Sequence, residues 1–251
     1  MVFWGRLVGA VVVTGSAALV ACSGSGGDPA PTISPESAAE STTTTTLPDG
    51  STPSRVTLVA QSNGKVRVWK EANSADSITL NAADQGSKLL TFLVVDQRDD
   101  GWLEVLLPGA PVGSKGFIQA KDVQVSRHRY RIEVSLSKHE IKLFAGQLEA
   151  AKSTVALGPD VPPAGTETFI KELRGPEFMT LYGSPIFGLA GASNSAKDIK
   201  AGKDVLAIHP VAVASLGKTT PTGSIGVDPA LMTRMTASLI LPLGTPVDIV
   251  E

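Results

Sequence analysis

Short apolar runs alternate with turn residues from Arg55 onward. Each run is rich in β-branched or aromatic residues, and Asn, Asp and Gly separate it from the next, as at Asn63-Gly64 and Asp99-Asp100-Gly101. In order the runs are VTLVAQ, KVRVWK, SITLNA, LLTFLVVDQ, GWLEVLL and KGFIQAKDVQV. Runs of this kind are typical of strands joined by hairpins. The pattern predicts a small β-barrel over residues 55–125.

A second β-rich unit is predicted over residues 129–251. The stretch RYRIEVSLSKHEIKLFAGQLEAAKSTVALG indicates two strands around a hairpin loop at residues 145–147, with a third strand ending at residues 155–158. Strand patterns return at DVLAIHP and at LPLGTPVDIVE. One helix is predicted in DPALMTRMTASLI, where Asp228 and Pro229 suit a helix start. The fold class expected is therefore mostly β, with one short helix in the second unit.

Composition agrees with this expectation and excludes one class of partner. Hydrophobic residues make up 42% of the 251-residue chain, enough for a real core, and 25 Gly with 17 Pro favour turns over long helices. The formal charge is -2, so the chain has no basic excess that would attract phosphate backbones. Nucleic acid is not an expected partner.

The N-terminus has the features of an export signal. Residues 1–21 contain one basic residue, Arg6, then an apolar run and small residues that end in Leu19-Val20-Ala21 before Cys22. This ending resembles the bacterial lipobox, which implies a signal peptide over 1–21 and a diacylglyceryl thioether, with chains such as palmitate, on Cys22. An ordinary cleaved signal with an incidental cysteine is the alternative. A transmembrane anchor is disfavoured because Thr14, Gly15 and Ser16 interrupt the ~20 apolar residues that a span needs.

Residues 22–54 follow as a tether. They are Ser, Thr, Gly, Pro and Ala with almost no large apolar side chain, so they cannot offset the entropy of ordering. With lipid on Cys22, the expected location is the outer face of the plasma membrane, within the cell envelope. Cys22 is the only cysteine, so an intramolecular disulfide and a cysteine metal site are excluded, and lipid on Cys22 would leave no free thiol. No cofactor and no metal are expected.

Taken in order, the segments from residue 129 onward resemble the L,D-transpeptidase family, whose members cross-link peptidoglycan stem peptides through a cysteine. The resemblance rests on the opening strand pair, on residues 165–169 (GTETF) as a substrate-side turn, on Ile208-His209 at a strand end and on the terminal LGTPV. Residues 55–125 resemble a bacterial SH3-like domain, a module found beside cell-wall enzymes. The resemblance implies an SH3-like barrel followed by a transpeptidase-like domain.

The catalytic signature of that family is altered in HPVAVASLGKTTPTGSIG, residues 209–226. His209 matches the first family histidine, with Pro210 in place of the following glycine. Pro221 and Thr222 stand at the serine and second-histidine positions, and Gly223, a source of an oxyanion N–H group, is kept. Ser224 stands where the nucleophilic cysteine belongs, and Gly226 stands where the arginine belongs. A serine hydroxyl is far more basic than a thiol and needs a well-oriented base.

Two functions are consistent with this replacement. The first is a membrane-anchored wall protein with a degenerate transpeptidase domain that binds a peptidoglycan stem peptide or a wall enzyme without catalysis. The second is an active peptidyl transferase that uses Ser224 and His209; a serine hydrolase on another substrate is more distant. A hydrogen bond from Ser224 to His209 in an open cleft would favour the enzyme. A cleft filled by Pro210 or by residues 211–220 would favour the binding protein.

Five further side chains have weaker signals. Trp69 and Trp102 are either barrel core or a ligand platform. His128 and His139 fit solvated positions in polar joins. Arg234 either forms a surface salt bridge or folds back to replace the missing arginine.

The lipid assignment predicts that Cys22→Ala abolishes acylation. In a bacterial host with lipoprotein maturation, a fatty-acid analogue should label the natural chain and leave the variant unlabelled, because only a thiol forms the thioether. In-gel detection after metabolic labelling measures this, and label retained by the variant would refute the assignment.

Overall fold

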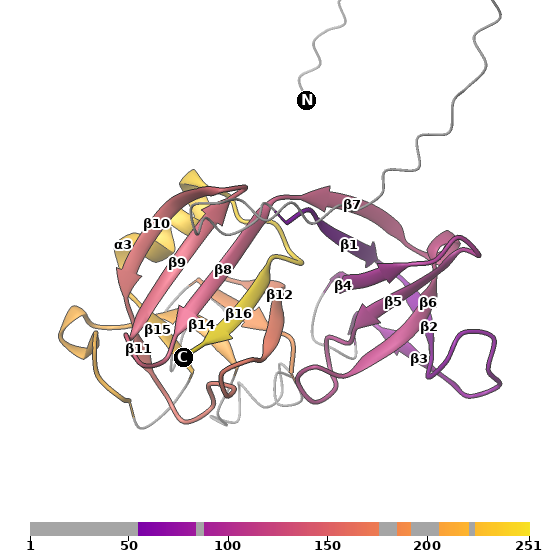
Figure 1. Ribbon diagram of the computed structural model, residues 1–251, viewed down its shortest axis with the longest axis horizontal. Helices are drawn as coiled ribbons and strands as arrows, with labels where there is room; N and C mark the ends of the chain where they lie inside the picture. Colours follow the sequence, from indigo (N-terminus) through magenta and orange to yellow (C-terminus); the bar gives the residue numbers. More distant parts are fainter. Residues whose placement is uncertain (1–54, 84–87, 176–184, 192–205, 221–223) are drawn as a thin grey trace, which may run out of the picture. The chain divides into compact units, whose positions relative to one another are not determined.

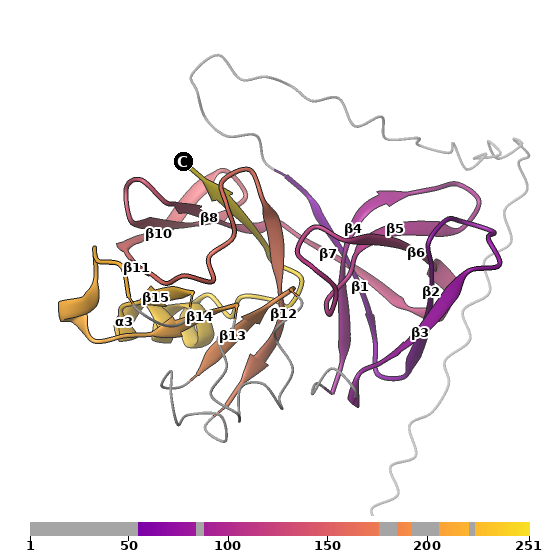
Figure 2. The ribbon, with the colours of Figure 1, turned by 90° about the horizontal axis from the view of Figure 1, so that it is seen from below.

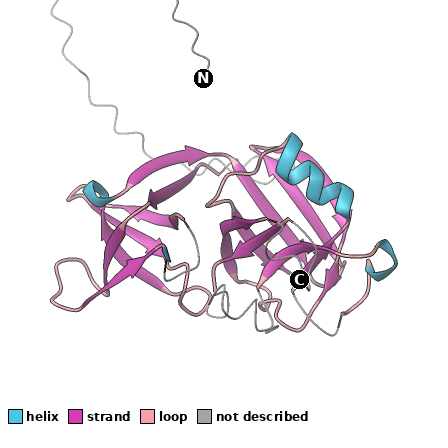
Figure 3. Cartoon of the chain, turned by 180° about the vertical axis from the view of Figure 1, so that it is seen from behind, coloured by secondary structure: helices cyan, strands magenta, loops and turns pink. Residues whose placement is uncertain are grey.

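The computed structural model describes residues 55–83, 88–175, 185–191, 206–220 and 224–251. In these residues strands predominate and one α-helix is present, so the predicted mostly-β fold is confirmed (Figure 1, Figure 3). Every described residue belongs to one compact unit. The predicted signal peptide, Cys22 and the tether lie outside the described residues.

The first sheet has seven strands, all antiparallel to their neighbours, in the order β3-β2-β6-β5-β4-β1-β7. They are β1 (Thr57–Ser62), β2 (Lys65–Trp69), β3 (Ser77–Asn81), β4 (Leu90–Gln97), β5 (Trp102–Leu106), β6 (Lys115–Gln119) and β7 (Gln124–His128). Figure 2 shows the curvature of this sheet. The six apolar runs correspond to β1 to β6.

Alternation along these strands builds the first core. In β2, for example, Val66 and Val68 are buried while Lys65 and Arg67 are exposed, as a strand with one wet face requires. The buried cluster contains Ala60, Val66, Val68, Ala82, Leu90, Phe92, Val94, Leu103, Val105 and Ile118. The sheet extends through His128, which pairs with Thr57, whereas we expected the first domain to end at residue 125. The domain boundaries themselves stay a prediction.

The second sheet has nine strands in the order β10-β9-β8-β16-β12-β13-β14-β15-β11. They are β8 (Tyr130–Ser135), β9 (Glu140–Ala145), β10 (Leu148–Thr154), β11 (Ala156–Leu157), β12 (Glu167–Arg174), β13 (Ile186–Leu189), β14 (Ala207–Pro210), β15 (Ile225–Val227) and β16 (Pro246–Val250). Two neighbouring pairs are parallel, β16 with β8 and β14 with β15. The hairpin loop at residues 145–147 is confirmed, with Gly146 at a φ of 66°.

The helix forms where the sequence indicated. Helix α3 (Pro229–Thr233) begins after Asp228, whose Oδ1 accepts a hydrogen bond from the Ala230 N–H at 2.7 Å, and Pro229 occupies the first turn. A π-helical turn, η5 (Arg234–Ser238), continues it. Leu231, Met232 and Met235 attach both to the core of the second sheet.

A large cluster of buried hydrophobic residues fills that core, and it includes side chains of β14 and β15. Its members include Ile132, Val134, Ile141, Leu143, Ile170, Phe187, Leu189, Ile208, Ile225, Val227 and Ile249. A smaller buried cluster contains side chains of both sheets: Leu93 and Leu106 of the first, Phe169 and Ala190 of the second. Among the described residues, no helix combines the length and apolar character needed to cross a membrane.

Candidate functional site

The strands β14 and β15 bring the two predicted catalytic residues together. They run parallel, with Ile208 aligned to Ile225 and His209 aligned to Gly226. Ser224 directly precedes β15. Because side chains alternate between faces, Ile208 and Ile225 enter the hydrophobic core, and Ser224, Gly226 and His209 lie on the opposite face of the sheet.

The Ser224 side chain is a structural part of this strand pair. Its Oγ accepts a hydrogen bond from the Ala207 N–H at 2.5 Å and donates one to the Ala207 carbonyl oxygen at 2.8 Å. Only 1% of Ser224 is exposed. Because a hydroxyl has one hydrogen to donate, the Ser224 proton points at a carbonyl, which cannot remove it. The backbone oxygen of Ser224 in turn accepts from the Gly158 N–H at 2.7 Å.

His209 is buried and held neutral. It is 6% exposed, and its Nδ1 lies 3.3 Å from the Pro210 carbonyl oxygen. A carbonyl only accepts, so Nδ1 carries the hydrogen in this contact. Burial lowers the pKa of His209, and the hydrogen bond to Pro210 opposes that shift more weakly. A neutral imidazole has the protonation state of a general base, but this one is shielded from solvent.

Gly226 has no room for the family arginine. A Cβ atom built on Gly226 would lie 2.5 Å from Val211 Cγ1 and 3.2 Å from Ala156 Cβ. Real Cβ atoms do not approach a neighbouring carbon this closely, so any larger residue must displace Val211. The isopropyl group of Val211 occupies the place where a longer side chain would begin.

Residues 211–220 are bonded across this end of the sheet. Val211 N–H donates to Val227 O at 2.9 Å, and Gly217 N–H donates to Val155 O at 3.0 Å. Leu157 exchanges two hydrogen bonds with the segment, accepting from Thr220 N–H at 2.9 Å and donating to Lys218 O at 3.1 Å. The loop is thus anchored on both β15 and β11, and its first residue covers Gly226.

The other motif positions lie outside the described residues. These are Pro221, Thr222 and Gly223, so the predicted oxyanion N–H of Gly223 stays a prediction. No group of three or more His, Cys, Asp or Glu side chains among the residues that the structure describes could hold a metal ion.

Two sequence expectations need correction. His128 is half-buried rather than solvated: its Nδ1 accepts from the Tyr130 N–H at 3.1 Å, and burial lowers its pKa to about 4. Arg234 donates to the Ala150 carbonyl oxygen at 2.5 Å, so its expected surface salt bridge is replaced by a backbone contact.

Of the two tryptophans, one belongs to the core and the other is partly exposed. Trp102 is core, with 5% of its surface exposed. Trp69 is half-buried on the outer face of β2 and meets Trp102 edge to face, with ring centroids 4.9 Å apart.

Sequence reasoning missed a buried charged cluster on β12. Lys171, Glu172 and Arg174 are each no more than 4% exposed. Arg174 donates to Glu172 Oε1 at 2.5 Å, and Lys171 Nζ donates to Pro108 O at 3.3 Å. Burial lowers the pKa of Lys171 to about 8, and the Glu172 carboxylate opposes that shift. The available signal in the sequence was the set of three charged residues in KELR, residues 171–174, because charged side chains that are buried in a strand must be paired.

Comparisons with known proteins give structural similarities only. No family model and no curated protein matches the chain. An L,D-transpeptidase from Xylanimonas cellulosilytica (residues 123–326) is 16% identical, covers 48% of this chain and 59% of its own, and has a TM-score of 0.35. Bd1075 of Bdellovibrio bacteriovorus is 19% identical, with 49% and 48% covered and a TM-score of 0.36. An L,D-transpeptidase from Mycobacterium smegmatis is 10% identical, with 74% and 99% covered and a TM-score of 0.38. This chain thus spans about half of the first two structures.

The packing at Gly226 predicts a rescue by a second substitution. Gly226→Ala should lower the free energy of unfolding by about 1–3 kcal/mol, because the new methyl group overlaps Val211. Val211→Ala should cost less and, combined with Gly226→Ala, should recover most of the loss. Urea unfolding of the two single variants and the double variant measures the coupling. Additive losses would show that Val211 does not fill the position.

Proposed function

We propose that this chain is a lipid-anchored protein of the bacterial cell envelope whose C-terminal domain is a degenerate L,D-transpeptidase domain. It binds a peptidoglycan stem peptide or a wall enzyme without transferring an acyl group. The anchor is the acylated Cys22 at the outer face of the plasma membrane, and residues 22–54 hold the folded part away from the lipid. The family assignment is supported by the order of the motifs along residues 129–251 and by the neighbouring strands that carry His209 and Ser224.

One observation is the main support for the absence of catalysis. The Ser224 hydroxyl both accepts a hydrogen bond from the Ala207 N–H and donates one to the Ala207 carbonyl oxygen, and Ser224 is 1% exposed. To attack a carbonyl, this hydroxyl would have to give up both of its hydrogen bonds to the buried Ala207 backbone. Each lost bond costs about 1–3 kcal/mol. A serine nucleophile works when an oriented base accepts its proton, and here the Ser224 hydroxyl donates to the Ala207 carbonyl oxygen.

The replaced arginine argues in the same direction. Val211 fills the space at Gly226, so no side chain from that position can orient a peptide ligand. Hydrogen bonds of Val211, Gly217 and Thr220 hold the loop 211–220 in place, so Val211 stays packed against Gly226.

The proposal predicts no covalent adduct with a carbapenem, which acylates the thiol of cysteine transpeptidases. The full chain should carry Cys22→Ala, so that an unacylated Cys22 thiol cannot react in place of the site. Intact-protein mass spectrometry should then show an unchanged mass, with a cysteine L,D-transpeptidase as the positive control. Co-sedimentation with isolated peptidoglycan should be retained and should not change on Ser224→Ala.

Two further variants sharpen this test. Ser224→Cys restores the thiol in a closed site without the arginine, so it should gain little transpeptidation. An adduct on Ser224 that disappears in His209→Ala would contradict the proposal and identify a serine enzyme.

A further inference from the structure

Strand β2 presents a row of side chains on the outer face of the first sheet. Val66 and Val68 point into the core, so Lys65, Arg67 and Trp69 share the opposite face. The partner strands continue this face: Thr79 of β3 is aligned with Arg67, and Phe117 of β6 is aligned with Trp69.

The Trp69 ring is held in place and is half-buried. The buried Trp102 meets it edge to face, at 90° and 4.9 Å between centroids. The Arg67 guanidinium carbon lies 5.6 Å from the Trp69 ring centroid, within cation–π range. A half-buried, braced indole loses little freedom when a flat apolar surface stacks on it, which is a requirement for a binding platform.

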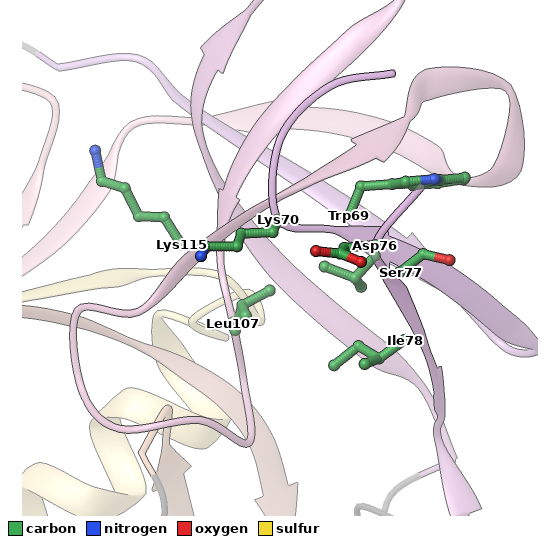
Figure 4. A pocket seen from close by; sticks show the side chains of 8 residues that line it. Trp69, Lys70, Asp76, Ser77, Ile78, Leu107 and Lys115 are labelled. Carbon is green, nitrogen blue, oxygen red and sulfur yellow. The ribbon is translucent and has the colours of Figure 1, made fainter. Parts of the chain in front are cut away.

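Two hollows flank Trp69, and it is the one residue that lines both. The first, of about 430 Å³, is lined by Ile78 and Leu107 (Figure 4) and by Val68, which is aligned with Ile78 on the side of the strands away from Trp69. Lys70 and Asp76 also line it, as Figure 4 shows. The second, of about 560 Å³, is more polar and is lined by Lys65, Arg67, Lys121 and Asp122. Hollows of this size accommodate one or two sugar-sized groups.

Positive charge exceeds negative charge around the platform. The two hollows together contain five cationic side chains, Lys65, Arg67, Lys70, Lys115 and Lys121, against two carboxylates, Asp76 and Asp122. Lys115 is paired with Glu104 at 3.0 Å. The other four cations form no ion pair within the part of the chain that the structure describes. This local excess of positive charge contrasts with the formal charge of the whole chain, which is -2.

From these observations we infer that the Trp69 surface binds an anionic glycan. One sugar ring stacks on the indole, and carboxylate or phosphate substituents on neighbouring units reach the cations of the flanking hollows. A repeating polymer fits because Trp69 lines both hollows. The inference rests on the proposed wall-associated function and assigns a ligand to the first sheet, apart from the Ser224 region.

Matched dextrans of one length test the inference: unmodified, carboxymethylated and phosphorylated. The full chain with Cys22→Ala is titrated with each, and binding is followed by tryptophan fluorescence and calorimetry. At least one charged dextran should bind ten-fold or more tightly than unmodified dextran. Raising NaCl from about 50 to 300 mM should weaken that binding about ten-fold, since screening acts on exposed charges. The stronger of the two charged dextrans identifies carboxylate or phosphate as the preferred group.

Variants locate the site. Trp69→Ala and Arg67→Gln should each lose about ten-fold in affinity, and Trp69→Phe, which keeps a ring and guards against misfolding, should lose less. Lys138→Gln removes an exposed positive charge from the second sheet and should change nothing.

Three results would overturn the inference: equal binding of unmodified dextran, unchanged affinity in both Trp69→Ala and Arg67→Gln, or tighter binding of poly-glutamate than of either charged dextran. The last would assign the face to an acidic protein. Failure here with peptidoglycan co-sedimentation intact would remove the anionic-glycan inference alone and leave the proposed function standing.

Discussion

The pair of hydrogen bonds between Ser224 and Ala207 determines what this end of the second sheet can do. Strand β15 is only three residues long and lies between a parallel neighbour, β14, and an antiparallel one, β11. The Ser224 hydroxyl extends its pairing with β14 by one residue, as both donor and acceptor. The same atom that a transpeptidase would need for attack therefore stabilises the strand pair.

Three neighbouring residues, Gly226, Val211 and His209, also have structural roles. Gly226 allows Val211 to pack against β15, and Val211 begins the loop whose far end is bonded to Val155 and Leu157. His209 becomes a buried, neutral side chain whose ring contacts the Pro210 carbonyl. Packing or hydrogen bonds thus hold each of these residues in place.

Much of the fold could be predicted because it depends on local signals. Alternation identified β1 to β6, Gly146 marked the hairpin between β9 and β10, and Asp228 with Pro229 marked the start of α3. The family motif order placed His209 and Ser224 in one region. The sequence could not show that the Ser224 hydroxyl bonds the Ala207 backbone, because that contact depends on the register of two parallel strands. Burial of His128 and of the Lys171 cluster likewise depends on tertiary packing. The polar sequence around each of them does not indicate this burial.

The stability of Ser224→Ala tests the central claim most directly. Removing a structural serine should lower the free energy of unfolding, whereas removing a catalytic serine should leave it unchanged or raise it. If Ser224 supports the strand pair, its loss removes two buried hydrogen bonds to the Ala207 backbone, and the free energy of unfolding should fall by about 1–3 kcal/mol. Ser137→Ala, at an exposed turn position, is the matched control and should change it by less than about 0.5 kcal/mol. Chemical denaturation of the three proteins measures both differences. Unchanged or increased stability in Ser224→Ala, as expected when a strained nucleophile is removed, would contradict the account.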